Sequence, residues 1–139
     1  MADDDTDDLF LFKNALDEVS TEVFLTVASD GQHLMERLEQ DTPPCPDFIL
    51  LDLNMPRKNG FECLAELKQS EKFKGIPVVI FSTSGDSDAV EKAFHSGASR
   101  FAKKPRSFKK LKSLIKELLA INWKQNTIYS LKNGFLLSG

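Results

Sequence analysis

Two short apolar runs constrain the fold of this chain most: FILL within DFILLDL (47–53) and PVVIF within IPVVIFSTS (76–84). A strand with one face in solvent alternates apolar and polar residues, whereas a strand covered on both faces is apolar throughout. We therefore predict that both runs are buried strands of a parallel sheet. Polar residues follow directly after each run, namely Asp52 after the first and the Ser82–Thr83 pair after the second.

Amphipathic stretches alternate with these runs. Their apolar residues recur every three to four positions, which is typical of helices packed on a core. The predicted helices cover 6–19, 31–40, 59–73, 85–98 and 106–121, and further strands are predicted at 21–29 and 99–104. Alternating strands and helices favour an α/β fold, a doubly wound parallel sheet with right-handed crossovers.

The composition sets outer limits on function. The 139 residues suffice for one domain, with 41% apolar and 28% charged residues. A net charge of −3 argues against a general binder of nucleic acids or membranes, and no apolar run is long enough to span a bilayer. Cys45 and Cys63 form no disulfide framework or metal spacing, so we expect a protein of the reducing cytoplasm.

Ligands of open parallel sheets bind outside the carboxyl ends of the strands. The polar residues at those predicted ends form one candidate pocket of several carboxylates, a hydroxyl and an ammonium. Taken singly, each has an ordinary explanation as a cap, a turn former or a surface charge. They are Asp3, Asp4 and Asp5 before the first helix, then Asp52, Ser82, Thr83, Lys103, Lys104 and Pro105.

This mixture of groups suits phosphoryl transfer. Crowded carboxylates cannot all stay ionised cheaply, so one of them binds a proton or the group binds a cation. Mg²⁺ prefers carboxylate, carbonyl and water oxygens and accepts phosphate oxygens as further ligands. An aspartate beside the metal can attack phosphorus, and the hydroxyl and ammonium can then bind the new phosphate oxygens.

With these motifs in view, the sequence resembles a response-regulator receiver domain of two-component signalling, of the stand-alone chemotaxis type. The resemblance is carried by ADDD (2–5), FILLDLNMPRKNG (48–60), VVIFSTS (78–84) and RFAKKP (100–105). It covers residues 2–121, and the 30 residues from Asp52 to Ser82 fit the family's spacing. It implies a flavodoxin-like, five-stranded sheet of order 2-1-3-4-5.

The resemblance also implies roles for residues on one side of the pocket. Asp52 is expected to accept the phosphoryl group from a histidine kinase. Asp4 would bind Mg²⁺ directly with Asp52, and Asp3 would assist through water. Asn54 would add its backbone carbonyl as a metal ligand, and Gly60 would permit a tight loop before its helix.

On the other side of the pocket, Ser82 stands where the family has its switching hydroxyl, and Phe101 where it has the aromatic that turns inward. Lys103 and Lys104 cannot both enter the pocket, because side chains alternate across a strand. Lys104, the residue before Pro105, is the expected phosphate-binding lysine. The Lys104–Pro105 bond is expected to be cis, as X–Pro bonds tolerate.

Two other functions are alternatives to a phospho-accepting receiver. A degenerate receiver would only dock partners and would take no phosphate. A haloacid-dehalogenase-type phosphatase also uses a strand-end aspartate and Mg²⁺, but it needs an acid where this chain has Asn54. His33 and His95 lack ligand spacing, so they are interpreted as ordinary polar or capping residues, and Cys63 as a packed residue.

The partners follow from the same resemblance. They are a histidine kinase or phosphotransfer protein and an unidentified downstream protein, without direct DNA binding or a membrane. The expected output face comprises the fourth helix, the fifth strand and the fifth helix. Seven basic residues between 103 and 116 form either a solvated surface or an interface, and a homodimer is one such arrangement.

Two features depart from the family pattern. Only Met1 and Ala2 precede the acids, so the first strand looks truncated. The receiver domain is assigned to 1–121 and a tail to 122–139, in which Asn133 and Gly134 mark a candidate β-hairpin between 126–131 and 135–138. We expect the tail, including 135–137, to cover apolar surface, either near the short first strand or across a dimer.

Overall fold

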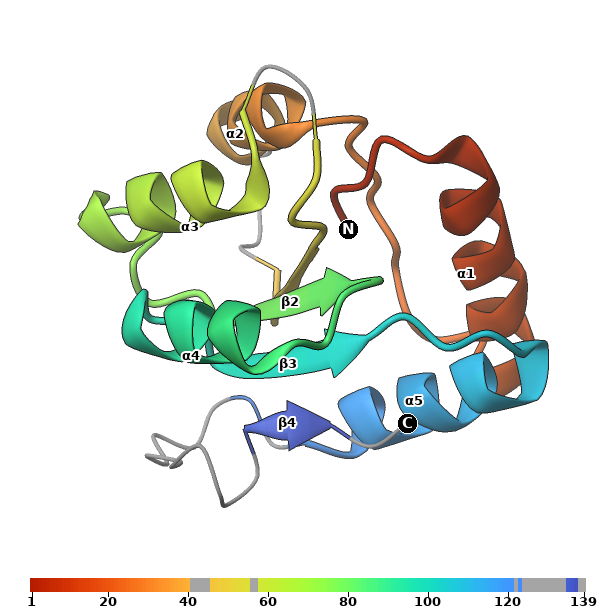
Figure 1. Cartoon of the computed structure of the whole chain (residues 1–139). Coiled ribbons are helices and arrows are strands. Elements are labelled where there is room, and N and C mark those ends of the chain that lie inside the picture. Colours follow the sequence, from red (N-terminus) through yellow and green to blue (C-terminus); the bar gives the residue numbers. More distant parts are fainter. Residues whose placement is uncertain (41–45, 56–57, 122, 124–134, 138–139) are drawn as a thin grey trace.

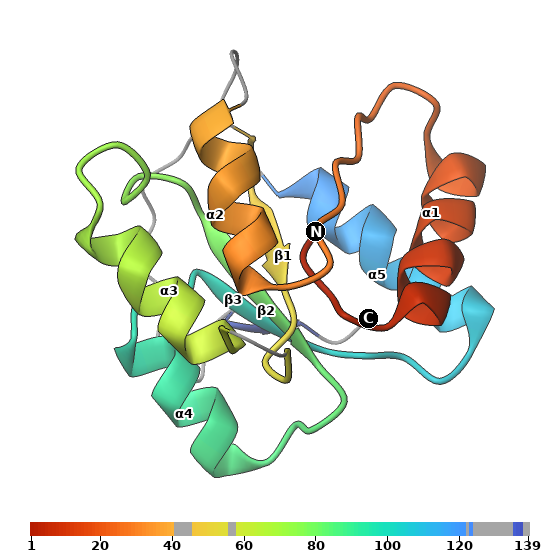
Figure 2. The same cartoon turned by 90° about the horizontal axis from the view of Figure 1, so that it is seen from above.

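In the computed structural model, the chain folds into a parallel β-sheet with helices on both faces (Figures 1 and 2). The structure describes residues 1–40, 46–55, 58–121, 123 and 135–137. The named strands follow the order β1-β2-β3-β4, and all neighbours are parallel. This arrangement confirms the predicted α/β class. The strands are β1 (Ile49–Leu51), β2 (Val78–Ser82), β3 (Arg100–Lys103) and β4 (Leu136–Leu137).

The helices cover the sheet in two layers (Figure 2). One layer holds α1 (Thr6–Val19) and α5 (Phe108–Ala120), which pack together, and the other holds α2 (Gly31–Gln40), α3 (Gly60–Gln69) and α4 (Ser87–His95). Phe108, the first residue of α5, is 37% exposed. Of the described helices, none has the length and apolarity to cross a membrane.

Strand β2 shows why its sequence is apolar throughout. Val78 and Ile80 point into the core beneath α2, α3 and α4, whereas Val79 and Phe81 point into the core beneath α1 and α5. All five residues of β2 are buried. The run of apolar residues therefore reflects a strand with helices on both faces.

The first strand is reduced to a bridge. Ala2 pairs in parallel with Ala28 on one side and with Leu51 on the other. The segments thus keep the predicted spatial order. The strand predicted at 21–29 is wrong, because only Ala28 of this segment forms a bridge. Phe24, in the middle of this segment, is fully exposed.

A cavity of about 1130 Å³ lies beside this short strand. Its lining includes Met1, Phe24, Phe48, Leu50 and Trp123. The rings of Phe48 and Trp123 stack there with centroids 4.5 Å apart. The space therefore lies between the segment before Ala28 and the strand that contains Leu50, on the track that a longer first strand would follow.

The described part of the tail lies at the other edge of the sheet, along β3, and not near the short first strand. Phe101 pairs with Leu136, and Phe135 is buried with its ring 5.2 Å from that of Phe94. Phe135 thus packs on α4 while the backbone of the tail pairs with β3. The first half of the candidate hairpin falls on 124–134, outside the described residues.

Candidate functional site

Asp3 and Asp52 lie side by side because their backbones are parallel neighbours. The Ala2 N–H donates to the Leu50 carbonyl at 2.8 Å, and the Asp52 N–H donates to the Ala2 carbonyl at 3.0 Å. This register brings both carboxyl groups to the carboxyl edge of the sheet, where ligands of such folds bind. Asp3 is fully buried and Asp52 is 5% exposed.

Asp4 completes a cluster of three carboxylates. Ligand atoms of Asp3, Asp4 and Asp52 lie within 4.8 Å of one another, with Asp4 exposed and the other two buried. Asp3 Oδ1 accepts from the Asp5 N–H at 3.0 Å, and the buried Asp3 Oδ2 faces the Lys104 ammonium at 2.8 Å. Three carboxylates in an all-oxygen donor set fit a hard divalent cation such as Mg²⁺.

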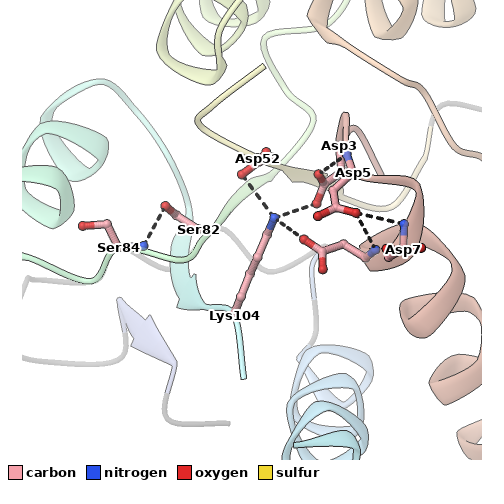
Figure 3. Close-up of polar contacts among 8 residues, drawn as sticks. Asp3, Asp5, Asp7, Asp52, Ser82, Ser84 and Lys104 are labelled. Atoms are coloured by element: carbon pink, nitrogen blue, oxygen red, sulfur yellow. Dashed lines mark hydrogen bonds and ion pairs between the residues drawn. The ribbon is translucent and has the colours of Figure 1, made fainter. Parts of the chain in front are cut away.

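Lys104 supplies the positive charge of the site (Figure 3). Its Nζ lies 2.8 Å from Asp3 Oδ2, 2.8 Å from Asp8 Oδ2 and 3.4 Å from Asp52 Oδ1. The Lys104 N–H donates to the Ser82 carbonyl at 2.7 Å, which fixes the backbone behind the side chain. Lys103, on the opposite side of the strand, is exposed, so the structure places Lys104 alone of the pair among the carboxylates.

The electrostatics of the site oppose ionisation of Asp52. Burial, and then the charge of Asp3, raise the pKa of Asp52 to about 6, although Lys104 lowers it in part. Burial alone would lower the pKa of Lys104, but hydrogen bonds to Asp3 and Asp8, together with the charges of Asp3 and Asp52, outweigh burial and raise it. Lys104 is therefore charged at neutral pH, and a cation that joined the cluster would favour the ionised form of Asp52.

Ser82 ends β2 at the same edge of the sheet. It is fully buried, and its Oγ accepts from the Ser84 N–H at 3.2 Å, while Thr83 is exposed (Figure 3). Phe101 is fully buried, and its N–H donates to the Phe135 carbonyl at 2.9 Å. In this conformation the aromatic ring therefore already lies in the core beneath the tail.

Gly60 is required by a close approach of two backbones. A Cβ at Gly60 would lie 2.4 Å from the Asp52 carbonyl oxygen and 2.7 Å from Leu53 Cα. The first turn of α3 can therefore pack directly behind Asp52. Asn54 is exposed in the loop between them.

The bond before Pro105 corrects one expectation. No described peptide bond is cis, so Lys104–Pro105 is trans. The trans form is favoured even for X–Pro bonds, by about 0.5–1 kcal/mol.

Asp8 is the site residue that the sequence interpretation missed. The start of α1 is capped by Asp5, whose side chain accepts from the Asp7 and Asp8 N–H groups. A signal was available in the helical period. Asp8 precedes Phe12 by four and Ala15 by seven positions, so it lies on the inward face of α1.

The histidines and Cys63 lie outside this site. His33 Nδ1 accepts from the Ser29 N–H at 3.1 Å, and His95 contacts the Phe94 ring at the end of α4. Cys63 is fully buried, and burial raises the pKa of its thiol to about 11. These positions agree with local packing and polar roles.

Comparison with known proteins places this arrangement in context. The sequence model of the response regulator receiver domain matches residues 1–116. Response regulator Rcp1 of Synechocystis sp. is 34% identical over 119 residues, which cover 83% of this chain and 81% of that protein. Two-component response regulator ORR5 of Oryza sativa is 33% identical over 86 residues, 62% of this chain and 63% of that protein.

Solved structures agree with the sequence matches. The Mn(2+)-bound form of Rcp1 superposes with a TM-score of 0.75 at 32% identity, covering 93% of this chain and 96% of that one. The phosphorylated cyanobacterial phytochrome response regulator RcpA superposes with a TM-score of 0.79 at 30% identity, covering 93% and 95%. Similarity therefore extends over nearly the whole of both chains.

Proposed function

Because this chain belongs to the family of response regulator receiver domains of two-component signalling, we propose that Asp52 accepts a phosphoryl group from a histidine kinase or a phosphotransfer protein. The observation that carries the proposal is the buried Asp52 carboxylate, 3.4 Å from the Lys104 ammonium and beside two further acids. The acids can bind a cation, and this cation together with the Lys104 ammonium can bind a small anion such as a phosphoryl group.

In the proposed reaction, an Asp52 carboxylate oxygen attacks phosphorus. The bond from phosphorus to the donor's imidazole nitrogen breaks, and the imidazole leaves with the bonding electron pair and takes up a proton. Lys104 neutralises negative charge on the transferred oxygens, because its ammonium stays protonated at neutral pH. The Ser82 hydroxyl, at the end of β2, donates a hydrogen bond to the bound phosphoryl group.

Mg²⁺ is the cofactor in this proposal. Asp3, Asp4 and Asp52 would hold it, with the backbone carbonyl of Asn54 as a further ligand. When bound, the ion would supply positive charge to the phosphate oxygens and lower the pKa of Asp52. The grouping of three carboxylates, whose ligand atoms lie within 4.8 Å of one another, supports this assignment.

The proposed output is a change in contacts with a downstream protein. Ser82 and Phe101 would form the switch, and α4, β3 and α5 the output face. The tail strand β4 pairs with β3 at this face, so the tail belongs to the proposed surface. A homodimer through the same surface, the assignment of 1–121 and 122–139 as separate units, and a cytoplasmic location stay predictions.

The rate of labelling by a small phosphodonor such as acetyl phosphate tests the proposal. Wild-type protein should take up phosphate with Mg²⁺ and should lose this activity with a chelator. Asp52→Asn should abolish labelling, whereas Asp47→Asn, an exposed acid before the same strand, should not. A wild-type chain that takes up no label would favour a degenerate docking receiver, and turnover of a phosphate ester would favour the phosphatase.

A further inference from the structure

Asp8 makes a contact that the phospho-acceptor mechanism does not use. Its Oδ2 accepts from Lys104 Nζ at 2.8 Å, across 96 residues of sequence. The contact joins the first turn of α1 to the residue that follows β3. The Lys104 side chain is 11% exposed and that of Asp8 is 32% exposed, so Asp8 approaches the ammonium from the more exposed side of the site.

The three acids around Lys104 are not equivalent. Asp3 and Asp52 belong to the cluster whose ligand atoms lie within 4.8 Å of one another, whereas Asp8 does not. A cation in that cluster would engage Asp3 and Asp52 and weaken their hold on the ammonium. Asp8 would keep its contact, because it comes from a separate element and needs no rearrangement to do so.

From this difference we propose that Asp8 is a positioning residue for Lys104. It holds the ammonium beside Asp52 while the other carboxylates bind the cation, so that the lysine is in place when the phosphoryl group arrives. The inference rests on the proposed function of Asp52, since positioning has a purpose only if an anion is bound there.

The physical reason is the freedom of a lysine side chain. Four methylene groups give Lys104 many rotamers, and fixing them costs up to about 2 kcal/mol of side-chain entropy. A carboxylate that holds the ammonium in advance removes this cost from the reaction itself. The contact should therefore affect the rate with donor bound more than the affinity for the donor.

Three variants separate positioning from charge. Asp8→Ala removes the acceptor and its charge, Asp8→Asn keeps an acceptor oxygen, and Asp7→Asn removes one charge from the same exposed turn. We expect Asp8→Ala to lower the labelling rate at saturating acetyl phosphate about tenfold, with little change in KM. Asp8→Asn should restore most of the rate, and Asp7→Asn should behave as the wild type.

A measurement without phosphodonor tests the contact itself. Proton exchange of the Lys104 ammonium, followed by ¹⁵N NMR with and without Mg²⁺, should be slow in wild-type protein and faster in Asp8→Ala. Wild-type rate and wild-type exchange in Asp8→Ala would overturn the inference. If the wild type takes no label, the proposed function fails, while the exchange data still show whether Asp8 holds Lys104.

Discussion

At the scale of single residues, the central feature is a conflict at Asp52. A nucleophilic carboxylate must be ionised, yet burial and the charge of Asp3 raise the pKa of Asp52 to about 6. Lys104 offsets only part of this effect. Without a metal, the positive charge of the site therefore does not balance its carboxylates. Removing or neutralising one carboxylate should stabilise the folded state.

We predict that Asp52→Asn raises the free energy of unfolding at pH 8 in the presence of a chelator, by about 1–3 kcal/mol. The folded pKa of Asp52 lies above its ordinary value of 3.8. Between about pH 4 and pH 6, Asp52 thus keeps a proton in the folded protein that it has lost in the unfolded chain. The free energy of unfolding of the wild type therefore falls as pH rises through this range.

Urea unfolding of both proteins at several pH values measures this effect. The difference in free energy of unfolding between the two proteins should reach its full size above about pH 6 and be nearly absent near pH 4. Saturating Mg²⁺ should reduce it at pH 8, because the ion neutralises the wild-type carboxylate. A gap that is independent of both pH and Mg²⁺ would show that the charge of Asp52 is not its cause.

Site residues were predictable where strand alternation and strand ends fixed them. Asp52 ends an apolar run, and alternation admits only one of Lys103 and Lys104 to the pocket. Asp8 was missed because it stands on a helix, among other acids with an ordinary capping explanation. The trans bond before Pro105 was missed because local sequence leaves the two isomers close in energy.

At the scale of elements, α3 is held against the site through Gly60. The N-terminus of this helix packs on the backbone of Asp52 and Leu53, and the Gly60 N–H donates to the Leu53 carbonyl at 2.9 Å. A side chain at this position would separate the helix from the strand end. The position of the phospho-acceptor therefore depends on a residue without a Cβ.

We predict that Gly60→Ala lowers the free energy of unfolding by about 1–3 kcal/mol, because its Cβ would meet rigid backbone atoms. Gly75→Ala is the matched control, since a Cβ there would meet nothing within 4 Å. Chemical denaturation of the two variants tests this. Equal stability of both would mean that the α3 backbone moves away at little cost.

The strand with which β4 pairs could not be predicted from the sequence of β4. Its residues favour a strand, but whether they pair with each other, with the first strand or with β3 depends on which apolar surface is free. In the structure, the Phe135 ring packs on Phe94, and the Phe135 carbonyl accepts from the Phe101 N–H of β3. Conversely, the segment 21–29 has strand-like composition but pairs in the structure only through the bridge at Ala28.

We predict that Phe135→Ala lowers the free energy of unfolding by about 3 kcal/mol, since it empties a fully buried position. Leu136→Ala, at an exposed position in the same strand, should cost much less. Thermal and urea unfolding compare the two. Similar losses in both variants would indicate that backbone pairing, and not the Phe135 ring, holds the tail on β3.

At the scale of the whole molecule, the two edges of the sheet differ. One edge gains a strand from the tail, whereas the other contains a short first strand beside a cavity of about 1130 Å³. The Met1 ammonium donates to the Thr26 carbonyl at 2.8 Å, and burial lowers its pKa to about 6. Packing is therefore less complete on this side of the molecule.

We predict that four apolar, β-branched residues added before Met1 raise the Tm, because they would fill the cavity and replace a partly desolvated amine by a peptide group. A Gly/Ser extension of the same length is the control and should leave the Tm nearly unchanged. Equal Tm values for the two extensions would show that the cavity does not accept a strand.

The central claim is that phosphate becomes bonded to Asp52. Treatment with acetyl phosphate and Mg²⁺, followed by borohydride reduction and peptide mass spectrometry, locates an aspartyl phosphate as homoserine at its position. The account predicts homoserine at position 52 and at none of Asp3, Asp4 or Asp8. Homoserine at another aspartate, with Asp52 unmodified in protein that has taken up phosphate, would contradict it.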